Sequence, residues 1–377
     1  MRAKSTVTAL AIVFTAWAVL AFGCFTGSAN AAAPVVLKIQ TAVPAASVYF
    51  ELMKRFGERI EKMSAGRIKT EMLPEGAVVA PFESLDAVGK GVVDGGFCWT
   101  HWWSGKAPGA LLFSAPLAGA TVGLDQLSHM AWYYEGGGQK LHQELFDDVL
   151  KANVVGFLLM PMGPDPLGWF KTPITSVADL KKMKYRAPPG IASEPYKEMG
   201  VPTISMGAGD MLPAAQKGVI DAGEWIGPAE DMNLGFHTVW KHYYLQGLHQ
   251  TTDVGEFILN KDVWNKLTPD LQEIFKIAAM ATVTDTWNFD VYRNAKALEI
   301  LKKQHGVTVH DTPQDYYPAF IKATQTVLEK YSAKDPFFKK VWDSQKEFAK
   351  IVVPYWNKVL QVYVNQGLTG AEMNGFK

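Results

Sequence analysis

Two segments far apart in the chain share almost the same seven residues. Residues 90–96 read Lys-Gly-Val-Val-Asp-Gly-Gly, and residues 217–223 read Lys-Gly-Val-Ile-Asp-Ala-Gly. In each, the first glycine can end a helix in the left-handed conformation, the apolar pair can enter a strand, and Asp-x-Gly can end that strand. Tryptophan follows both segments. The repeat predicts the same helix-to-strand corner in two similar lobes, although shared turn chemistry alone is an alternative explanation.

Strand and helix patterns alternate around both corners. We expect strands at residues 35–40, 68–73, 92 onward, 154–160, 184–186 and 219–221, and helices at 47–63, 81–90, 177–183, 193–199 and 211–217. This β-α-β-α-β alternation, which restarts at residue 154, predicts an α/β fold with mostly parallel sheets covered by helices. Ligands of such sheets bind outside the carboxyl ends of the strands. Both corners are therefore expected to face a cleft between the lobes.

The last third of the chain is helical in pattern. A helix is expected from Thr268-Pro269 to about His305, without a further Pro or Gly. At 1.5 Å per residue it would be roughly 55 Å long, so it should span both lobes. Helices are also expected at 316–331 and from Asp335-Pro336 past Pro354. The broad apolar face from Phe337 to Val364 indicates either a cap on one lobe or contact with a partner chain.

The first 31 residues have the pattern of a signal peptide. Arg2 and Lys4 precede an apolar run from Val7 to Phe22, and Ala29-Asn-Ala31 is a cleavage sequence. A membrane anchor is the alternative, but the run is shorter than the roughly 20 residues a span needs. Cys24 is a poor match to a lipidation site. We therefore expect an exported protein, most simply of a bacterial periplasm.

Composition and motifs exclude several classes of function. Lys plus Arg and Asp plus Glu both number 37, so the chain has no basic excess for nucleic acid. The common nucleotide, zinc-protease and serine-hydrolase motifs are absent, and no nucleophile stands beside a base, so no enzyme activity is expected. Cys98, in Gly-Phe-Cys-Trp, is expected to be a buried structural thiol.

Charged residues follow several expected strands. Arg186 could hold a carboxylate through a bidentate fork, with a surface salt bridge as the alternative. Glu224 and Asp165 follow apolar strands, and a buried carboxylate needs a cation, donors or a proton. Two acids with the amide oxygen of Gln250 would suit Ca²⁺. His101, after the first corner, is either a pocket-lining donor or a zinc ligand.

The order of these motifs resembles a known family. The signal segment, Leu-Lys-Ile-Gln-Thr at 37–41, the first corner, Lys-Tyr-Arg-Ala-Pro-Pro-Gly at 184–190 and Gly-Val-Ile-Asp-Ala-Gly-Glu-Trp at 218–225 resemble the solute receptors of TRAP transporters (tripartite ATP-independent periplasmic transporters). Glu224-Trp225 and Gly168-Trp169-Phe170 further resemble the branch that binds 2-oxo and 2-hydroxy monocarboxylates, such as pyruvate and lactate, with a metal ion.

The resemblance implies a two-lobe periplasmic binding protein (a Venus flytrap) and roles for particular residues. Arg186 would clamp the ligand carboxylate, and Glu224 with the Trp225 backbone would bind the metal. Asp165 stands where the branch usually carries glutamine, which favours Ca²⁺ over Na⁺. The substrate-binding set so implied is Arg186, Trp225, His101, Trp102, Trp103, Asp165 and Trp169, and the metal set is Glu224, Trp225, Asp165 and Gln250.

The resemblance also implies an organisation and partners. Lobe I would hold residues 32–155 and about 251–285, and lobe II residues 156–250, with the long helix at 268–305. The C-terminal helices, 306–377, would allow a homodimer, because known members can pair by exchanging such a helix. The partner would be the membrane permease of a TRAP transporter. A receptor of ABC-type transport or of a sensor, and a metal-dependent enzyme using Glu224 as base, remain the alternatives.

Overall fold

The computed structural model describes residues 33–114 and 117–375. Residues 36–377 form one compact unit, and the description below concerns that unit alone. The expected signal peptide, residues 1–31, lies outside the described residues. Among the helices of the described residues, none combines the length and the apolar character that a membrane crossing requires.

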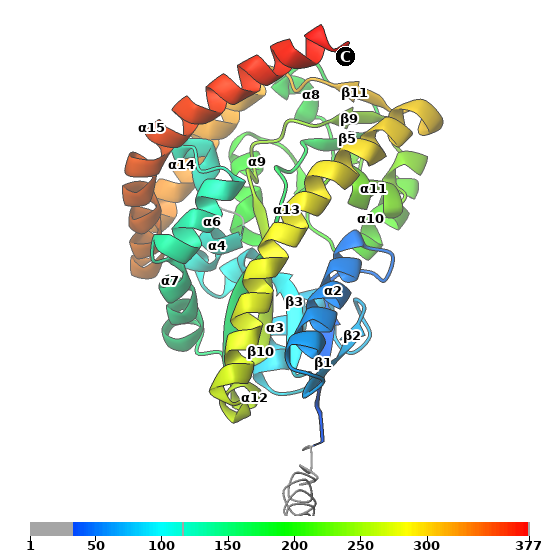
Figure 1. Ribbon diagram of the computed structural model, residues 1–377. Coiled ribbons are helices and arrows are strands. Elements are labelled where there is room, and N and C mark those ends of the chain that lie inside the picture. The colour runs from blue at the N-terminus through cyan, green and yellow to red at the C-terminus, as the bar shows by residue number, and fades with distance from the viewer. Residues whose placement is uncertain (1–32, 115–116, 376–377) are drawn as a thin grey trace, which may run out of the picture. The chain divides into compact units, whose positions relative to one another are not determined.

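Two β-sheets organise this unit (Figure 1). The first has the strand order β2-β1-β3-β10-β4, and the second has the order β11-β9-β5-β8-β6-β7. The strands of the first sheet are β1 (Val35–Thr41), β2 (Ile68–Leu73), β3 (Gly95–Trp99), β4 (Val154–Met162) and β10 (Asp253–Asn260). The strands of the second are β5 (Gly168–Phe170), β6 (Tyr185–Arg186), β7 (Thr203–Ile204), β8 (Ala222–Gly223), β9 (His242–Tyr244) and β11 (Thr308–His310). Helices cover both sheets, which gives the expected two-lobe α/β fold.

Each sheet mixes parallel and antiparallel pairs. β3 runs parallel to β1, and β6 runs parallel to both β7 and β8, as the alternation predicts. β10 instead runs antiparallel to β3 and β4, and β5 runs antiparallel to β8 and β9. These two strands follow segments that carry the chain from one sheet to the other, and they enter their sheet from the opposite direction. The prediction of mostly parallel sheets therefore holds for the β-α-β units and is wrong for the crossing strands.

β4 belongs to the first sheet, where it pairs with β10 along Asp253–Asn260. The sequence pattern placed residues 154–160 at the start of the second lobe, and this placement is wrong. An apolar run identifies a buried strand without identifying the sheet that contains it. The second sheet begins at β5.

Helices cover the sheets and join them. The helices are α2 (Val48–Met63), α3 (Ser84–Gly89), α4 (Leu111–Ser114), α5 (Ala118–Val122), α6 (Gln126–Glu135), α7 (Gly138–Glu144), α8 (Val177–Leu180), α9 (Glu194–Glu198), α10 (Ala208–Gln216), α11 (Pro228–Asn233), α12 (Lys261–Lys266), α13 (Pro269–His305), α14 (Tyr316–Ser332) and α15 (Pro336–Met373). Shorter helical turns are η1 (Pro81–Glu83), η2 (Thr100–Gly105), η3 (Pro108–Ala110), η4 (Leu145–Val149), η5 (Gly190–Ser193) and η6 (Phe236–Thr238).

The long helix α13 confirms the prediction made from residues 268–305. Pro269 occupies its first turn, and Gly306 ends it with a φ of 64°. The helix packs on β4 and α2 beside the first sheet and on α11 beside the second (Figure 1). It therefore links the two lobes as one uninterrupted helix.

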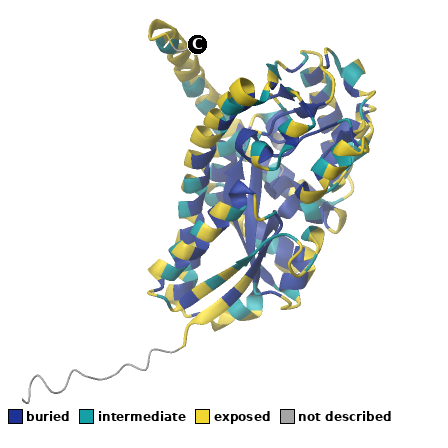
Figure 2. Ribbon diagram, turned by 90° about the vertical axis from the view of Figure 1, so that its right-hand side faces the viewer, coloured by how far each residue is buried: buried dark blue, intermediate teal, exposed yellow. Residues whose placement is uncertain are grey.

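The C-terminal helix α15 has two different halves. Asp335 caps its start by accepting a hydrogen bond from the Phe338 amide at 2.7 Å. Its first half packs on α6 and α14 and buries Phe338, Val341 and Trp342. Its second half, with Ile351 just before it, exposes the apolar side chains of Ile351, Tyr355, Val362, Tyr363, Val364, Leu368 and Met373. Figure 2 shows this end as a largely exposed helix that projects from the sheets.

The repeated corners have the same hydrogen bonds at their helix ends. Gly91 and Gly218 adopt φ values of 72° and 70°, which confirms the expected left-handed helix ends. In both corners the next residue closes the turn. Val92 donates to the Ala87 carbonyl and Val219 to the Ala214 carbonyl, each at 2.9 Å. The two seven-residue segments, identical at five positions, therefore encode the same turn, used once in each lobe.

The aspartates of the two corners begin the strands. The Asp94 carboxylate accepts from the Lys38 amide at 2.8 Å, and the Asp221 carboxylate accepts from the Lys184 amide at 3.1 Å. β3 and β8 start directly after these residues. The prediction that Asp-x-Gly ends the strand is wrong. Each aspartate lies just before its strand, and its carboxylate accepts a hydrogen bond from the backbone of the neighbouring chain segment.

Replacing Gly218 by alanine tests whether the corner requires a positive φ. A Cβ there would meet nothing within 4 Å, so a steric clash does not contribute. We expect Gly218→Ala to lower the free energy of unfolding by about 1 kcal/mol, since alanine resists a positive φ. Gly367→Ala is the matched control. It lies within α15, where a Cβ also meets nothing, so it should leave stability unchanged or raise it. Urea unfolding measures both; equal stability of Gly218→Ala and the parent would contradict the assignment.

Candidate functional site

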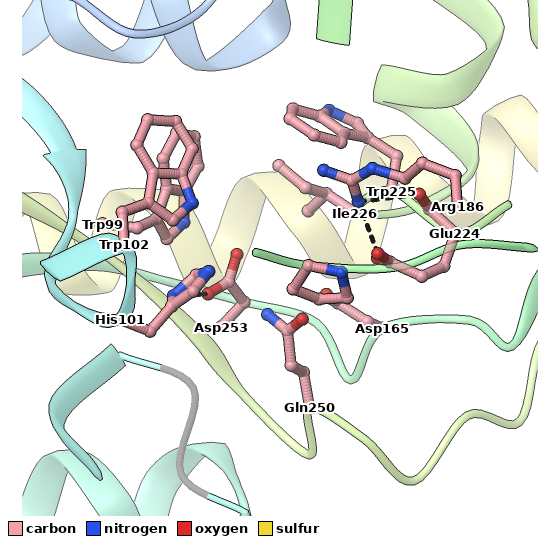
Figure 3. Close-up of a pocket in the computed structure, with 11 residues that line it drawn as sticks. Trp99, His101, Trp102, Asp165, Arg186, Glu224, Trp225, Ile226, Gln250 and Asp253 are labelled. Atoms are coloured by element: carbon pink, nitrogen blue, oxygen red, sulfur yellow. Dashed lines mark hydrogen bonds and ion pairs between the residues drawn. The ribbon is translucent and has the colours of Figure 1, made fainter. Parts of the chain in front are cut away.

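A cavity lies where the carboxyl ends of strands from the two sheets meet (Figure 3). Its lining residues are Trp99, His101, Trp102, Asp165, Arg186, Pro188, Glu224, Trp225, Ile226, Gln250 and Asp253. Trp99 ends β3 in the first sheet, whereas Arg186 ends β6 and Glu224 follows β8 in the second. Residues that follow both corners therefore line one cavity, but the corners themselves lie where β3 and β8 begin and contribute no lining residue, so the expectation that the corners face the cleft is wrong.

Arg186 is buried and held in place by several acceptors. Its Nη1 donates to the Glu224 carboxylate and, at 3.1 Å, to the Glu224 carbonyl. Its Nη2 and Nε donate to the Met206 carbonyl at 2.9 and 3.2 Å. The guanidinium carbon lies 4.6 Å from the centre of the Trp225 ring. These contacts exclude the surface salt bridge and fix the orientation of the guanidinium at the cavity wall.

Three buried side chains in and beside this cavity could hold a metal ion. Asp165, Glu224 and His249 each place a ligand atom within 4.8 Å of the others. Both carboxylate oxygens of Asp165 are buried without a hydrogen-bond partner among the described residues. Burial, with the charges of Asp253 and Glu224, raises the pKa of Asp165 well above its usual value. A cation bound here would supply the charge that these oxygens lack.

The backbone joins the loops that carry these ligands. The Asp165 amide donates to the Gln250 carbonyl at 3.0 Å, and Gln250 lines the same cavity. The structure thus brings Asp165, Glu224, Trp225 and Gln250 together. His249 was missed by sequence reasoning, although it directly precedes Gln250. Its Nε2 lies 3.6 Å from the Glu224 carboxylate.

Asp253 and Trp99 are further lining residues that sequence reasoning missed. Asp253 begins β10, lies 4 % exposed and has its Oδ1 3.8 Å from the His101 ring. Burial and the charge of Glu224 raise its pKa. No motif marks this aspartate, because it enters the cavity only through the pairing of β10 with β3 and β4.

Aromatic rings form the wall opposite Arg186 (Figure 3). The ring centres of Trp99 and Trp102 lie 4.9 Å apart in this wall, and Trp225, on the side of Arg186, has its ring centre 6.3 Å from that of Trp99. His101 joins this wall, with its Nδ1 2.8 Å from the Ser114 hydroxyl. Burial and nearby Arg186 lower its pKa to about 3, so the ring is neutral. His101 lines the cavity and is not part of the metal-ligand group found among the described residues, and its role as a pocket-lining donor stays a prediction.

Trp103 and Trp169 do not line the cavity, so their predicted contact with a ligand is wrong. Trp103 donates to the buried Glu256 carboxylate at 3.0 Å. Successive side chains of a 3₁₀ turn point about 120° apart, so Trp103 cannot share the direction of both preceding residues. Trp169 stacks on Tyr243 at 4.2 Å and donates to Asp231 at 2.8 Å. Both indoles are core residues of their lobes.

Glu256 anchors the turn that presents His101 and Trp102. Besides Trp103, it pairs with His142, whose Nε2 lies 3.0 Å from its Oε2. The Cys98 thiol lies 3.8 Å from its Oε1. Burial, followed by the charge of Glu256, raises the pKa of Cys98, so the thiol remains protonated and unreactive. Cys98 is thus the buried structural thiol that its sequence context predicts.

The fold and the cavity are those of a two-lobe solute-binding protein. A family model described as bacterial extracellular solute-binding protein, family 7, the DctP family, matches residues 39–335. The chain belongs to this family. It is also 32 % identical over 336 residues to the monocarboxylate 2-oxoacid-binding periplasmic protein of Nostoc sp. strain PCC 7120, covering 89 % of each protein.

Solved structures show the same architecture. A TRAP transporter solute-binding protein from Bordetella bronchiseptica RB50 is 27 % identical, with a TM-score of 0.83 over 90 % of this chain and 99 % of that one. It is a dimer with copurified calcium and picolinate in one active site and an apo second site. A TRAP solute-binding protein from Colwellia psychrerythraea, with bound calcium and pyruvate, is 25 % identical, with a TM-score of 0.81 over 88 % and 99 %.

Proposed function

We propose that this chain is the periplasmic receptor of a TRAP transporter and binds a 2-oxo or 2-hydroxy monocarboxylate together with Ca²⁺. The observation that carries the proposal is the cluster of Asp165, Glu224 and His249 beside Arg186. The relatives that bind 2-oxo acids, or calcium with pyruvate or picolinate, support it. The bound acid would pass unchanged to a membrane permease, without covalent chemistry.

The charges at the cavity favour a divalent ion. Three lining carboxylates, Asp165, Glu224 and Asp253, face one guanidinium, that of Arg186. When all four groups are ionised, the lining has a net charge of −2. One Ca²⁺ ion would neutralise this charge, whereas one Na⁺ ion would leave −1. Carboxylates, the Gln250 amide and the Trp225 carbonyl would supply hard oxygen ligands.

The Arg186–Glu224 pair couples the cation to the solute. Glu224 occupies Nη1 of the guanidinium in this structure. If Glu224 instead turns its charge toward a cation, Nη1 is free to donate to the carboxylate of the solute. The flat wall of Trp99 and Trp102 would then contact the side group of the acid, which allows an aromatic acid such as picolinate as well as pyruvate.

We also propose that the two sheets mark two lobes that close as a hinge. Lobe I would hold residues 32–155 with about 251–285, and lobe II residues 156–250, with β4 transferred to lobe I and β11 added to lobe II. Solute and cation bind residues from both lobes, so they would stabilise the closed form by their difference in affinity for the closed and open forms.

Replacing Arg186 tests the carboxylate clamp. We expect Arg186→Ala to weaken binding of pyruvate in the presence of calcium at least a hundredfold, because a charge-assisted bidentate contact is lost. Isothermal titration calorimetry measures the change. Arg67→Ala, at an exposed arginine paired with Asp270, is the matched control and should bind normally. Unchanged affinity in Arg186→Ala would remove this role.

Removal of calcium tests the metal. A chelator should abolish pyruvate binding by the parent protein, and added Ca²⁺ should restore it. Glu224→Gln should bind more weakly and depend less on Ca²⁺, because it loses a charged ligand. Full binding in chelator would contradict the metal. Native mass spectrometry of the purified protein would also count the metal and weigh any copurified acid.

The exposed second half of α15 supports a homodimer. Its apolar side chains include Ile351, Tyr355 and Val362, which share one helix face. We expect a dimer in solution by size-exclusion chromatography with light scattering. Replacing these three residues by aspartate should give a monomer, whereas Gln361→Asp at another exposed position should not. A monomeric parent protein would contradict the proposal.

A further inference from the structure

Two helix N-termini lie at the rim of the cleft. α2 follows β1, and α10 follows β7, so each helix starts near the carboxyl end of a strand. The first turn of a helix leaves backbone N–H groups without intrahelical acceptors and carries partial positive charge. In both cases an acidic side chain from the opposite lobe meets that first turn.

Glu230 makes the first of these contacts. It lies on α11 beside the second sheet, is 1 % exposed, and its Oε2 accepts from the Val48 amide of α2 at 2.8 Å. The neighbouring Tyr49 makes its contacts within lobe I and with α13. Ser47 accepts from the Tyr49 amide at 3.1 Å, and the Tyr49 hydroxyl donates to Asp290 at 3.2 Å. The Val48 amide is thus satisfied across the cleft.

Glu75 makes the second contact, in which the acid belongs to lobe I and the helix N-terminus to lobe II. It follows β2 of the first sheet and lies over the start of α10 in the second lobe. Its Oε1 is 3.2 Å from the position that a Cβ of Gly207 would take, and both oxygens lie within 3.8 Å of the corresponding position at Gly209. Its Oε2 is buried without a hydrogen-bond partner among the described residues. Burial, with the charge of Asp210, raises its pKa to about 7.

We propose that Glu230 and Glu75 are closure latches, one at each rim of the cleft, which set solute affinity without touching the solute. The inference rests on hinge closure in the proposed function. In an open form, water would satisfy both carboxylates and both helix ends. In the closed form, Glu230 replaces water at the Val48 amide, which would be costly to bury without an acceptor, and Glu75 covers the start of α10 without a direct hydrogen bond.

The latches should therefore act on opening of the closed form. We expect Glu230→Ala to weaken binding of pyruvate with calcium about tenfold, through faster dissociation at an unchanged association rate. Glu230→Gln keeps an oxygen acceptor for Val48, so it should stay within about threefold of the parent. Glu58→Ala, at an exposed glutamate of α2, is the matched control. Stopped-flow fluorescence and calorimetry measure rates and affinity.

The Glu75 latch can be tested separately from Glu230. Glu75→Ala should weaken binding about threefold, because no direct hydrogen bond is lost, and Glu71→Ala on the exposed side of β2 is its control. In the double variant Glu75→Ala/Glu230→Ala the two losses should multiply, since the contacts lie at separate places.

The outcomes separate the latches from the proposed function. Parent-like dissociation of Glu230→Ala, or equal impairment of Glu230→Ala and Glu230→Gln, would overturn the latch. If the parent protein itself does not bind the probe, the proposed function fails instead. The latch is then decided without solute, by small-angle X-ray scattering: Glu230→Ala should have a larger radius of gyration than Glu230→Gln, and equal radii would overturn it.

Discussion

The buried pairing of Arg186 with Glu224 is the interaction around which the cleft is built. Arg186 ends β6 and Glu224 follows the adjacent strand β8, and the Met206 carbonyl accepts from Nε and Nη2 of the guanidinium. Asp165 and Asp253 add carboxylates that this guanidinium cannot neutralise alone. Burying such charges is costly unless further positive charge arrives. A bound cation would supply that charge, and binding of the proposed solute would then be linked to binding of the cation.

Much of the fold could be predicted from the sequence, because local rules determine it. The two corners are alike because each uses a glycine to end its helix and an aspartate side chain to accept a hydrogen bond from a neighbouring backbone amide. α13 has a proline start, a glycine end and no interruption. The sheet that contains β4 could not be predicted, because its apolar run is equally suited to either sheet. The antiparallel entry of β10 and β5 depends on where the chain crosses between lobes, which no local pattern records.

The residues of the site likewise fall into those that the sequence could predict and those that it could not. Arg186, Glu224 and Asp165 are charged residues at or just beyond the ends of strands, and that contrast marks them in the sequence. Asp253 and His249 have no such contrast and reach the cavity only through strand pairing and loop position. The error at Trp103 shows the limit of reading neighbouring residues as a group, because one turn of η2 sends its side chains in different directions.

The same topology explains how an anionic solute could approach a cleft rich in acids. Strands that point their carboxyl ends at the cleft also start the following helices there, so α2 and α10 bring partial positive charge to its rim. Glu230 and Glu75 meet these helix ends from the opposite lobe only where the lobes come together. In an open form the helix ends would be uncovered, and the rim would attract a carboxylate while the floor attracts a cation. Closure would then cover the helix ends with the protein's own acids. The rim would thus favour entry of the solute when open and resist its escape when closed.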